Sequence, residues 1–112
     1  MNVAQNHGHA RTRSSGENLF ASINAAARPR LAMLVSGLLP EGRREGNEWI
    51  ARNPRRDDHR PGSFKVNLVT GRWADFASGD RGGDIISLVA YLRRLSQLEA
   101  ARLLARELGA RL

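Results

Sequence analysis

The chain has 112 residues, which is enough for one domain with a modest core and too short for an additional large catalytic domain. It contains 18 basic and 11 acidic residues, for a formal charge of +7, and Lys65 is its only lysine. Arginine suits phosphate and stacks on bases, so this balance favours a polyanionic partner, although a GC-rich genome produces the same bias. The absence of cysteine excludes disulfides, thiolate catalysis and cysteine-based zinc sites.

The first 17 residues are polar and basic, with too few apolar side chains to offset the entropy of ordering. We therefore expect a disordered basic tail at 1–17, including His7 and His9, ahead of one folded domain at 18–112. No apolar run approaches the roughly 20 residues of a membrane helix, and the amino terminus lacks the order of a signal peptide. A cytoplasmic protein without a membrane partner is the expectation.

Two helices are predicted at the start of the domain. Asn18 can cap the first helix, which the Arg28-Pro29 pair interrupts because proline disfavours a helical residue before it. Pro29 can open the second helix. One face of that helix is apolar at i, i+3, i+4 and i+7, formed by Leu31, Leu34, Val35 and Leu38.

Three strands are predicted next. Residues 41–47 form a polar loop with two glycines, and residues 48–51 form a short strand. Residues 63–68 alternate between apolar and polar side chains, and the turn signal Thr70-Gly71 separates them from residues 72–77. These last two segments form an antiparallel hairpin in the prediction.

Two further helices are predicted at the end of the chain. Asp84 is placed to cap the first of them, and Ser96 with Glu99 forms a capping box for the second. The expected apolar face of the last helix consists of Leu98, Ala101, Ala105 and Leu108, with Gly109 at its end. The predicted fold class is α+β, with a small three-stranded antiparallel sheet flanked by N-terminal and C-terminal helices.

The segment from Asn53 to Leu92 resembles the zinc-binding domain (the CHC2-type zinc finger) of bacterial primases and of primase-helicases from phages, plasmids and mobile elements. That family opens with Cys-Pro-x-His, continues through an acidic residue to Pro-Ser-Phe and a hairpin, and closes with Cys-x-x-Cys before Gly-Gly-Asp and an apolar helix. The matching segments here are Asn53-Pro54-Arg55-Arg56, Asp58, Pro61-Gly62-Ser63-Phe64, Trp73-Ala74-Asp75-Phe76 and Gly82-Gly83-Asp84.

The zinc ligands of the family are replaced in this sequence. Asn53 and Arg56 stand at the positions of the first cysteine and the histidine, and Phe76 and Gly79 stand at the closing cysteine pair. Zinc needs thiolate, imidazole or carboxylate ligands. The resemblance therefore implies a zinc-ribbon-like domain with no metal or other cofactor, in which Phe76 packing beneath the hairpin or an Arg56 contact to Asp75 substitutes for the metal.

Basic residues gather between the predicted strands, where they can follow the phosphates of a single strand. Trp73 either stacks on a base or belongs to the core, whereas Trp49 and Phe64 are expected in the core. The loop arginines either bind phosphate or neutralise Asp57 and Asp58. The predicted nucleic-acid-binding residues are Arg43, Arg44, Arg52, Arg55, Arg56, Arg60, Lys65, Arg72, Trp73 and Arg81.

Two structural roles are possible for the two glycines before the predicted helix at Asp84. Gly82 and Gly83 either cradle a phosphate at the amino end of that helix or supply a left-handed turn ahead of its cap. The turn is the favoured reading.

Three classes of function follow. The resemblance implies a non-catalytic module that binds single-stranded template DNA beside a primase or primase-helicase, in the replication of a mobile element, plasmid or phage. The alternative is a module that docks a primase, helicase or replication initiator through its terminal helices. An enzyme would need Mg²⁺ held by carboxylates such as Asp57, Asp58, Asp75, Asp80 and Asp84. We expect no enzyme activity, because Asp84 is committed to a cap and arginines crowd the loop pair.

Overall fold

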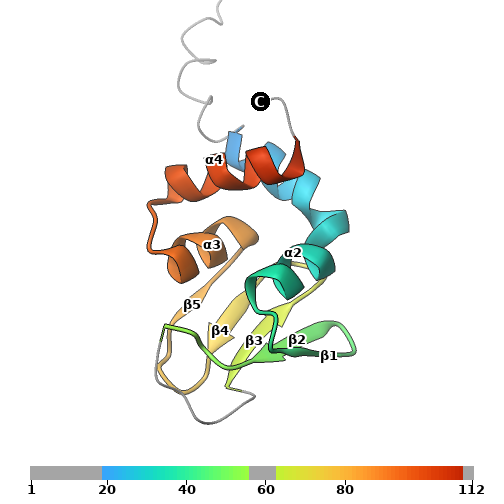
Figure 1. Cartoon of the computed structure of the whole chain (residues 1–112), viewed down its shortest axis with the longest axis vertical. Helices are drawn as coiled ribbons and strands as arrows, with labels where there is room; N and C mark the ends of the chain where they lie inside the picture. Colours follow the sequence, from blue (N-terminus) through green and yellow to red (C-terminus); the bar gives the residue numbers. More distant parts are fainter. Residues whose placement is uncertain (1–18, 56–62, 110–112) are drawn as a thin grey trace, which may run out of the picture.

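The computed structural model describes residues 19–55 and 63–109 of the chain (Figure 1). Residues 19–27 are helical and run into a short 3-10 helix. The expected cap at Asn18 and the tail at 1–17 lie outside the described residues. The elements that follow are η1 (Arg28–Arg30), α2 (Leu31–Leu38), β1 (Arg43–Glu45), β2 (Glu48–Ala51), β3 (Phe64–Asn67), β4 (Trp73–Asp75), β5 (Arg81–Gly82), α3 (Ile85–Arg93) and α4 (Gln97–Leu108).

The five strands form one antiparallel sheet in the order β1-β2-β3-β4-β5, so each strand pairs with its neighbour in sequence. The prediction of three strands is therefore wrong, although the α+β class is confirmed. The three predicted strands correspond to β2, β3 and β4, and the sheet gains one strand at each edge.

The two missed strands have no buried face, which is why hydropathy did not reveal them. All three residues of β1 are exposed, and β5 has only two residues. A sequence signal for β1 exists in its turn. Gly46-Asn47 separates Glu45 from its partner Glu48, and Gly46 has a φ of +61°, which a two-residue hairpin turn favours.

The helices gather on one side of the sheet (Figure 1). The expected apolar face of α2 is confirmed, with Leu31, Leu34 and Val35 buried. Both predicted caps of the C-terminal helices are confirmed, because Asp84 and Ser96 accept hydrogen bonds from the third backbone N–H of α3 and α4. Gly109 ends α4 in the left-handed conformation.

The predicted apolar face of α4 is displaced from the observed one. The buried residues of the helix are Ala100, Ala101 and Leu104, whereas Leu98 is exposed. Two of the three buried residues are alanines, so the positions of the leucines alone did not predict the buried face of α4. Within the described ranges, no helix is long and apolar enough to cross a membrane.

The core lies between the sheet and the helices. Phe64 and Trp73 stack with ring centroids 5.6 Å apart, and the ring of Tyr91 from α3 lies 4.7 Å from Trp73. Trp49 is half-buried against the same core, and its indole N–H donates to the Leu39 carbonyl at 2.9 Å. The expectation that Phe64 and Trp49 pack in the core is confirmed.

Candidate nucleic-acid interface and the position of the metal ligands

The strand register separates the sheet into a core face and an outward face. Phe64 and Val66 point into the core, so Lys65 between them points outward, because successive side chains of a strand alternate. Lys65 pairs with Ile50 on one side and Ala74 on the other. Extended across the sheet, this register gives one outward row of Arg43, Ile50, Lys65, Ala74 and Arg81.

Two more outward positions flank this row, one directly before and one directly after the strand β4. The backbone carbonyl of Arg72 accepts a hydrogen bond from the backbone N–H of Asn67, and Arg72 directly precedes the inward-facing Trp73. Phe76 donates its backbone N–H to Ser63 at 2.8 Å and follows the inward-facing Asp75. We call the outward residues of β3, β4, β5 and their adjoining turns the basic face, which consists of Lys65, Asn67, Arg72, Ala74, Phe76 and Arg81.

The basic face carries three cations and no carboxylate. Within residues 19–55 and 63–109, the one ion pair joins Arg43 to Glu45 at 2.6 Å, on the far edge of the sheet. Lys65, Arg72 and Arg81 therefore have no carboxylate within ion-pair distance in the described part of the chain. Cations that form no ion pair within this part of the chain are available for external phosphates.

A groove lies along the β4–β5 edge of this face. It encloses about 510 Å³ and is lined by Arg72, Trp73, Ala74, Arg81, Gly82 and Gly83. The lining combines two arginines with Ala74 and two glycines, so a phosphate can approach the backbone there.

Among the described residues, the other predicted binding residues lie away from the basic face. Arg44 pairs with the inward-facing Trp49, and its Nε donates to the Gly46 carbonyl. The guanidinium of Arg55 lies 4.6 Å from the centroid of the Tyr91 ring, on the helix side of the sheet. Arg52 is exposed directly after β2. Arg56 and Arg60 lie outside the described residues.

Trp73 belongs to the core. Its side chain is 5% exposed, and its indole N–H donates to the Ser87 hydroxyl at 3.0 Å. The rings of Phe64 and Tyr91 flank it, so no base can stack on it without unfolding the hairpin. The exposed aromatic residue of the sheet is instead Phe76, at 71% exposure. Strand alternation from Trp73 could have placed Phe76 outward.

A hydrogen-bond network occupies the position at which the family resemblance places a metal. Asn53 is 1% exposed, and its Nδ2 donates to Asp75 Oδ2 at 2.8 Å and to Tyr91 Oη at 2.7 Å. Tyr91 Oη donates in turn to Asp80 Oδ2 at 2.7 Å, and Asn53 Oδ1 accepts the backbone N–H of Arg55 at 2.8 Å. The network joins the segment after β2, the β4–β5 turn and α3.

The network also shifts a protonation equilibrium. Burial raises the pKa of the Tyr91 hydroxyl above its usual 10.0, and the hydrogen bond to the Asp80 carboxylate raises it further. Tyr91 therefore stays a neutral donor and acceptor within this network near neutral pH.

Three of the four residues at the metal positions, Asn53, Phe76 and Gly79, lie among the described residues. Both Asn53 amide donors and its carbonyl oxygen are already hydrogen-bonded, and Phe76 and Gly79 offer no ligand atoms. No group of three or more His, Cys, Asp or Glu residues within the described ranges is arranged to hold a metal ion. The expectation that Phe76 packs beneath the hairpin is wrong, because its ring is exposed. The expected contact of Arg56 lies outside the described residues.

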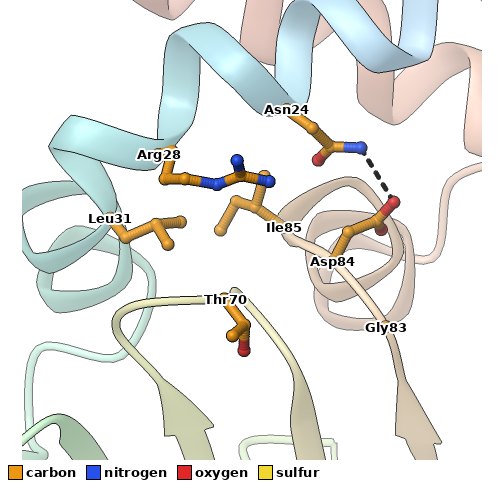
Figure 2. A pocket seen from close by; sticks show the side chains of 7 residues that line it. All are labelled: Asn24, Arg28, Leu31, Thr70, Gly83, Asp84 and Ile85. Atoms are coloured by element: carbon orange, nitrogen blue, oxygen red, sulfur yellow. Dashed lines mark hydrogen bonds between the residues drawn. The ribbon is translucent and has the colours of Figure 1, made fainter.

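A second hollow of about 250 Å³ lies at the amino end of α3 (Figure 2). Asn24 from the first helix donates from Nδ2 to Asp84 Oδ2 at 3.0 Å, and Arg28 and Thr70 also line the hollow. Asp84 Oδ1 caps the helix by accepting the Ser87 N–H at 2.8 Å. A carboxylate already occupies this helix end, so it does not offer an anion site.

Gly82 and Gly83 do not form the left-handed turn that the prediction favoured. Neither Gly82 nor Gly83 has a positive φ, so the turn reading is wrong. A Cβ at Gly82 would overlap Trp73 Nε1 and Ser87 Oγ. Gly82 is therefore required by the close approach of β5 to the indole ring, whereas a Cβ at Gly83 would meet open space.

These features define a small α+β domain with one helix-covered sheet face and one basic outward face. No family model and no curated protein matches the sequence. Among solved structures, the chain is similar to the crystal structure of the Aquifex aeolicus primase (zinc-binding and RNA polymerase domains), with a TM-score of 0.67 and 27% sequence identity. The match covers 80% of this chain and 22% of that chain, so this chain spans about a fifth of that structure. The fold is therefore primase-related.

Proposed function

We propose that this chain is a module that binds single-stranded template DNA through the basic face and works beside a primase or primase-helicase. Replication of a mobile element, plasmid or phage is the setting that the resemblance to primase zinc-binding domains implies. Catalysis belongs to the partner chain in this proposal. The primase-related fold fits such a role.

The observation that carries the proposal is a set of three cations on one sheet face that have no carboxylate within ion-pair distance among residues 19–55 and 63–109. Lys65 and Arg81 lie in one cross-strand row with Ala74 between them, and Arg72 lies one outward position along β4. Each would otherwise repel the others, so the arrangement favours a polyanion that spans all three. Other proteins bind single-stranded nucleic acid in grooves that combine such cations with aromatic rings.

The proposal includes folding without zinc. The hydrogen bonds of Asn53 to Asp75 and Tyr91 join the segments that the metal joins in the family, so they can take over its structural role. Breaking a buried polar network is costly, and this makes it an effective cross-link.

The docking alternative has weaker support. The exposed apolar residues Met33 and Leu98 lie on different helices, and the groove between α2, α3 and α4 encloses only about 90 Å³. A protein interface usually requires a larger continuous apolar patch.

Fluorescence anisotropy of a labelled single-stranded oligonucleotide, titrated at two salt concentrations with duplex DNA as comparison, tests the proposal. The triple variant Lys65→Gln, Arg72→Gln and Arg81→Gln should bind more weakly. Its salt slope should fall by about two, since each single-strand phosphate contact contributes about 0.7.

A charge-matched control separates local contact from net charge. Arg30→Gln, Arg102→Gln and Arg106→Gln remove three exposed positive charges from the helices instead of the sheet. The control should keep the affinity and salt slope of the wild-type chain. Equal losses in both variants, or no binding by the wild-type chain near physiological salt, would refute the assignment of the basic face.

A further inference from the structure

Phe76 holds an apolar ring in solvent on a backbone that is fixed. The ring is 71% exposed. The Phe76 N–H donates to Ser63 O, the Gly79 N–H donates to Asp75 O, and the Ala77 N–H donates to Asp75 Oδ1, each at 2.8 to 2.9 Å. Gly79 completes the turn with a φ of +86°. The backbone from which the ring projects is thus held in place by the fold.

The surroundings of the ring suit a nucleotide. Its cross-strand neighbour Ser63 and its neighbour along β4, Ala74, both have small side chains, which leave space beside the ring. The Lys65 Nζ lies 5.7 Å from the ring centroid. The cation lies over the ring, so a base that stacks on the ring brings its phosphate within reach of Lys65.

An exposed phenylalanine forgoes the stabilisation that burial of its ring would provide. Core packing does not explain this position, since the ring lies outside the core cluster. A ligand that covers the ring recovers the lost burial. Among ligands that also attract the cations Lys65, Arg72 and Arg81, an unpaired nucleobase on a phosphate backbone meets both requirements.

We propose that Phe76 is the base-stacking residue of the basic face and that Lys65 neutralises the phosphate of the stacked nucleotide. This inference rests on the proposed function and adds to it the residue that makes the face select single strands. Because every base has a π-face, stacking on Phe76 tolerates any base and contributes little to sequence preference. Duplex DNA, whose bases stack on one another, cannot use the ring.

The test compares single-stranded oligonucleotides that carry bases throughout with ones that carry abasic sites, by anisotropy against the full chain. Phe76→Ala should weaken binding of the base-bearing strand about five- to hundredfold and leave the abasic strand nearly unaffected. Its salt slope should stay that of the wild-type chain, because no phosphate contact is lost. Phe76→Trp should restore binding, and Phe76→Leu should not.

The control is Met33→Ala, which truncates an exposed apolar residue on α2, away from the sheet. It should leave both affinities unchanged. If the wild-type chain binds the single strand and Phe76→Ala binds it equally well, the stacking role is overturned while the basic face stands. If the wild-type chain binds neither strand, the proposed function and this inference both fall.

Discussion

Asn53 should be among the most sensitive positions of the domain, and its replacement by alanine can be worked through from the contacts. The change removes a bond to the Asp75 carboxylate, a bond to Tyr91 and an acceptor for the Arg55 N–H. A hydrogen bond to a charged group contributes about 1.5–3 kcal/mol and each neutral one about 0.5–1.5 kcal/mol. The expected loss in the free energy of unfolding is therefore about 2.5–6 kcal/mol.

That loss is large beside the whole stability of a domain this size, which is about 5–15 kcal/mol. Urea unfolding followed by tryptophan fluorescence measures it, and the melting temperature should fall by more than about 10 °C. The same curves recorded with a metal chelator should coincide with those recorded without it. A loss below about 1 kcal/mol for Asn53→Ala, or a chelator effect on the wild-type chain, would refute the argument that the network replaces the metal.

Two companion variants sharpen this test. Asn53→Asp keeps the shape but places a second carboxylate against Asp75, which is 0% exposed. It should be unstable at neutral pH and recover part of its stability in acid, as one carboxylate takes up a proton. Asn47→Ala removes an exposed amide from the β1–β2 turn and should change the unfolding free energy by less than about 0.5 kcal/mol.

Two further predictions concern the packing of α3 against the sheet. Gly82→Ala should cost about 2–4 kcal/mol in urea unfolding, because its Cβ would displace Trp73 and break the bond to Ser87, whereas Gly83→Ala, which meets open space, should be nearly neutral. The raised pKa of Tyr91 stabilises the fold below pH 10.0, and this contribution should be lost as pH rises through the folded pKa. Tyr91 is the only tyrosine, so its ultraviolet titration reports this pKa directly, and a midpoint at or below 10.0 would contradict the burial argument.

The helices and central strands could be predicted from the sequence because their buried faces produce a periodic pattern of apolar residues. The face of α2 and the alternation of β3 reappear in the structure with their buried residues as expected. The caps at Asp84 and Ser96 could also be predicted, since capping depends on neighbours within three residues. Edge strands β1 and β5 escaped prediction, because a strand without a buried face has no alternation to detect.

Some features of the candidate site could likewise be predicted from the sequence, and others could not. Local alternation already placed Lys65 outward and, followed three residues past Trp73, places Phe76 outward as well. The hydrogen bonds of Asn53 could not be predicted from the sequence, because its partners Asp75 and Tyr91 lie 22 and 38 residues away. Only the folded domain brings them within hydrogen-bond distance. Composition by itself determined a surplus of arginine. Which cations share one face was decided by strand register, a property of pairing between distant segments.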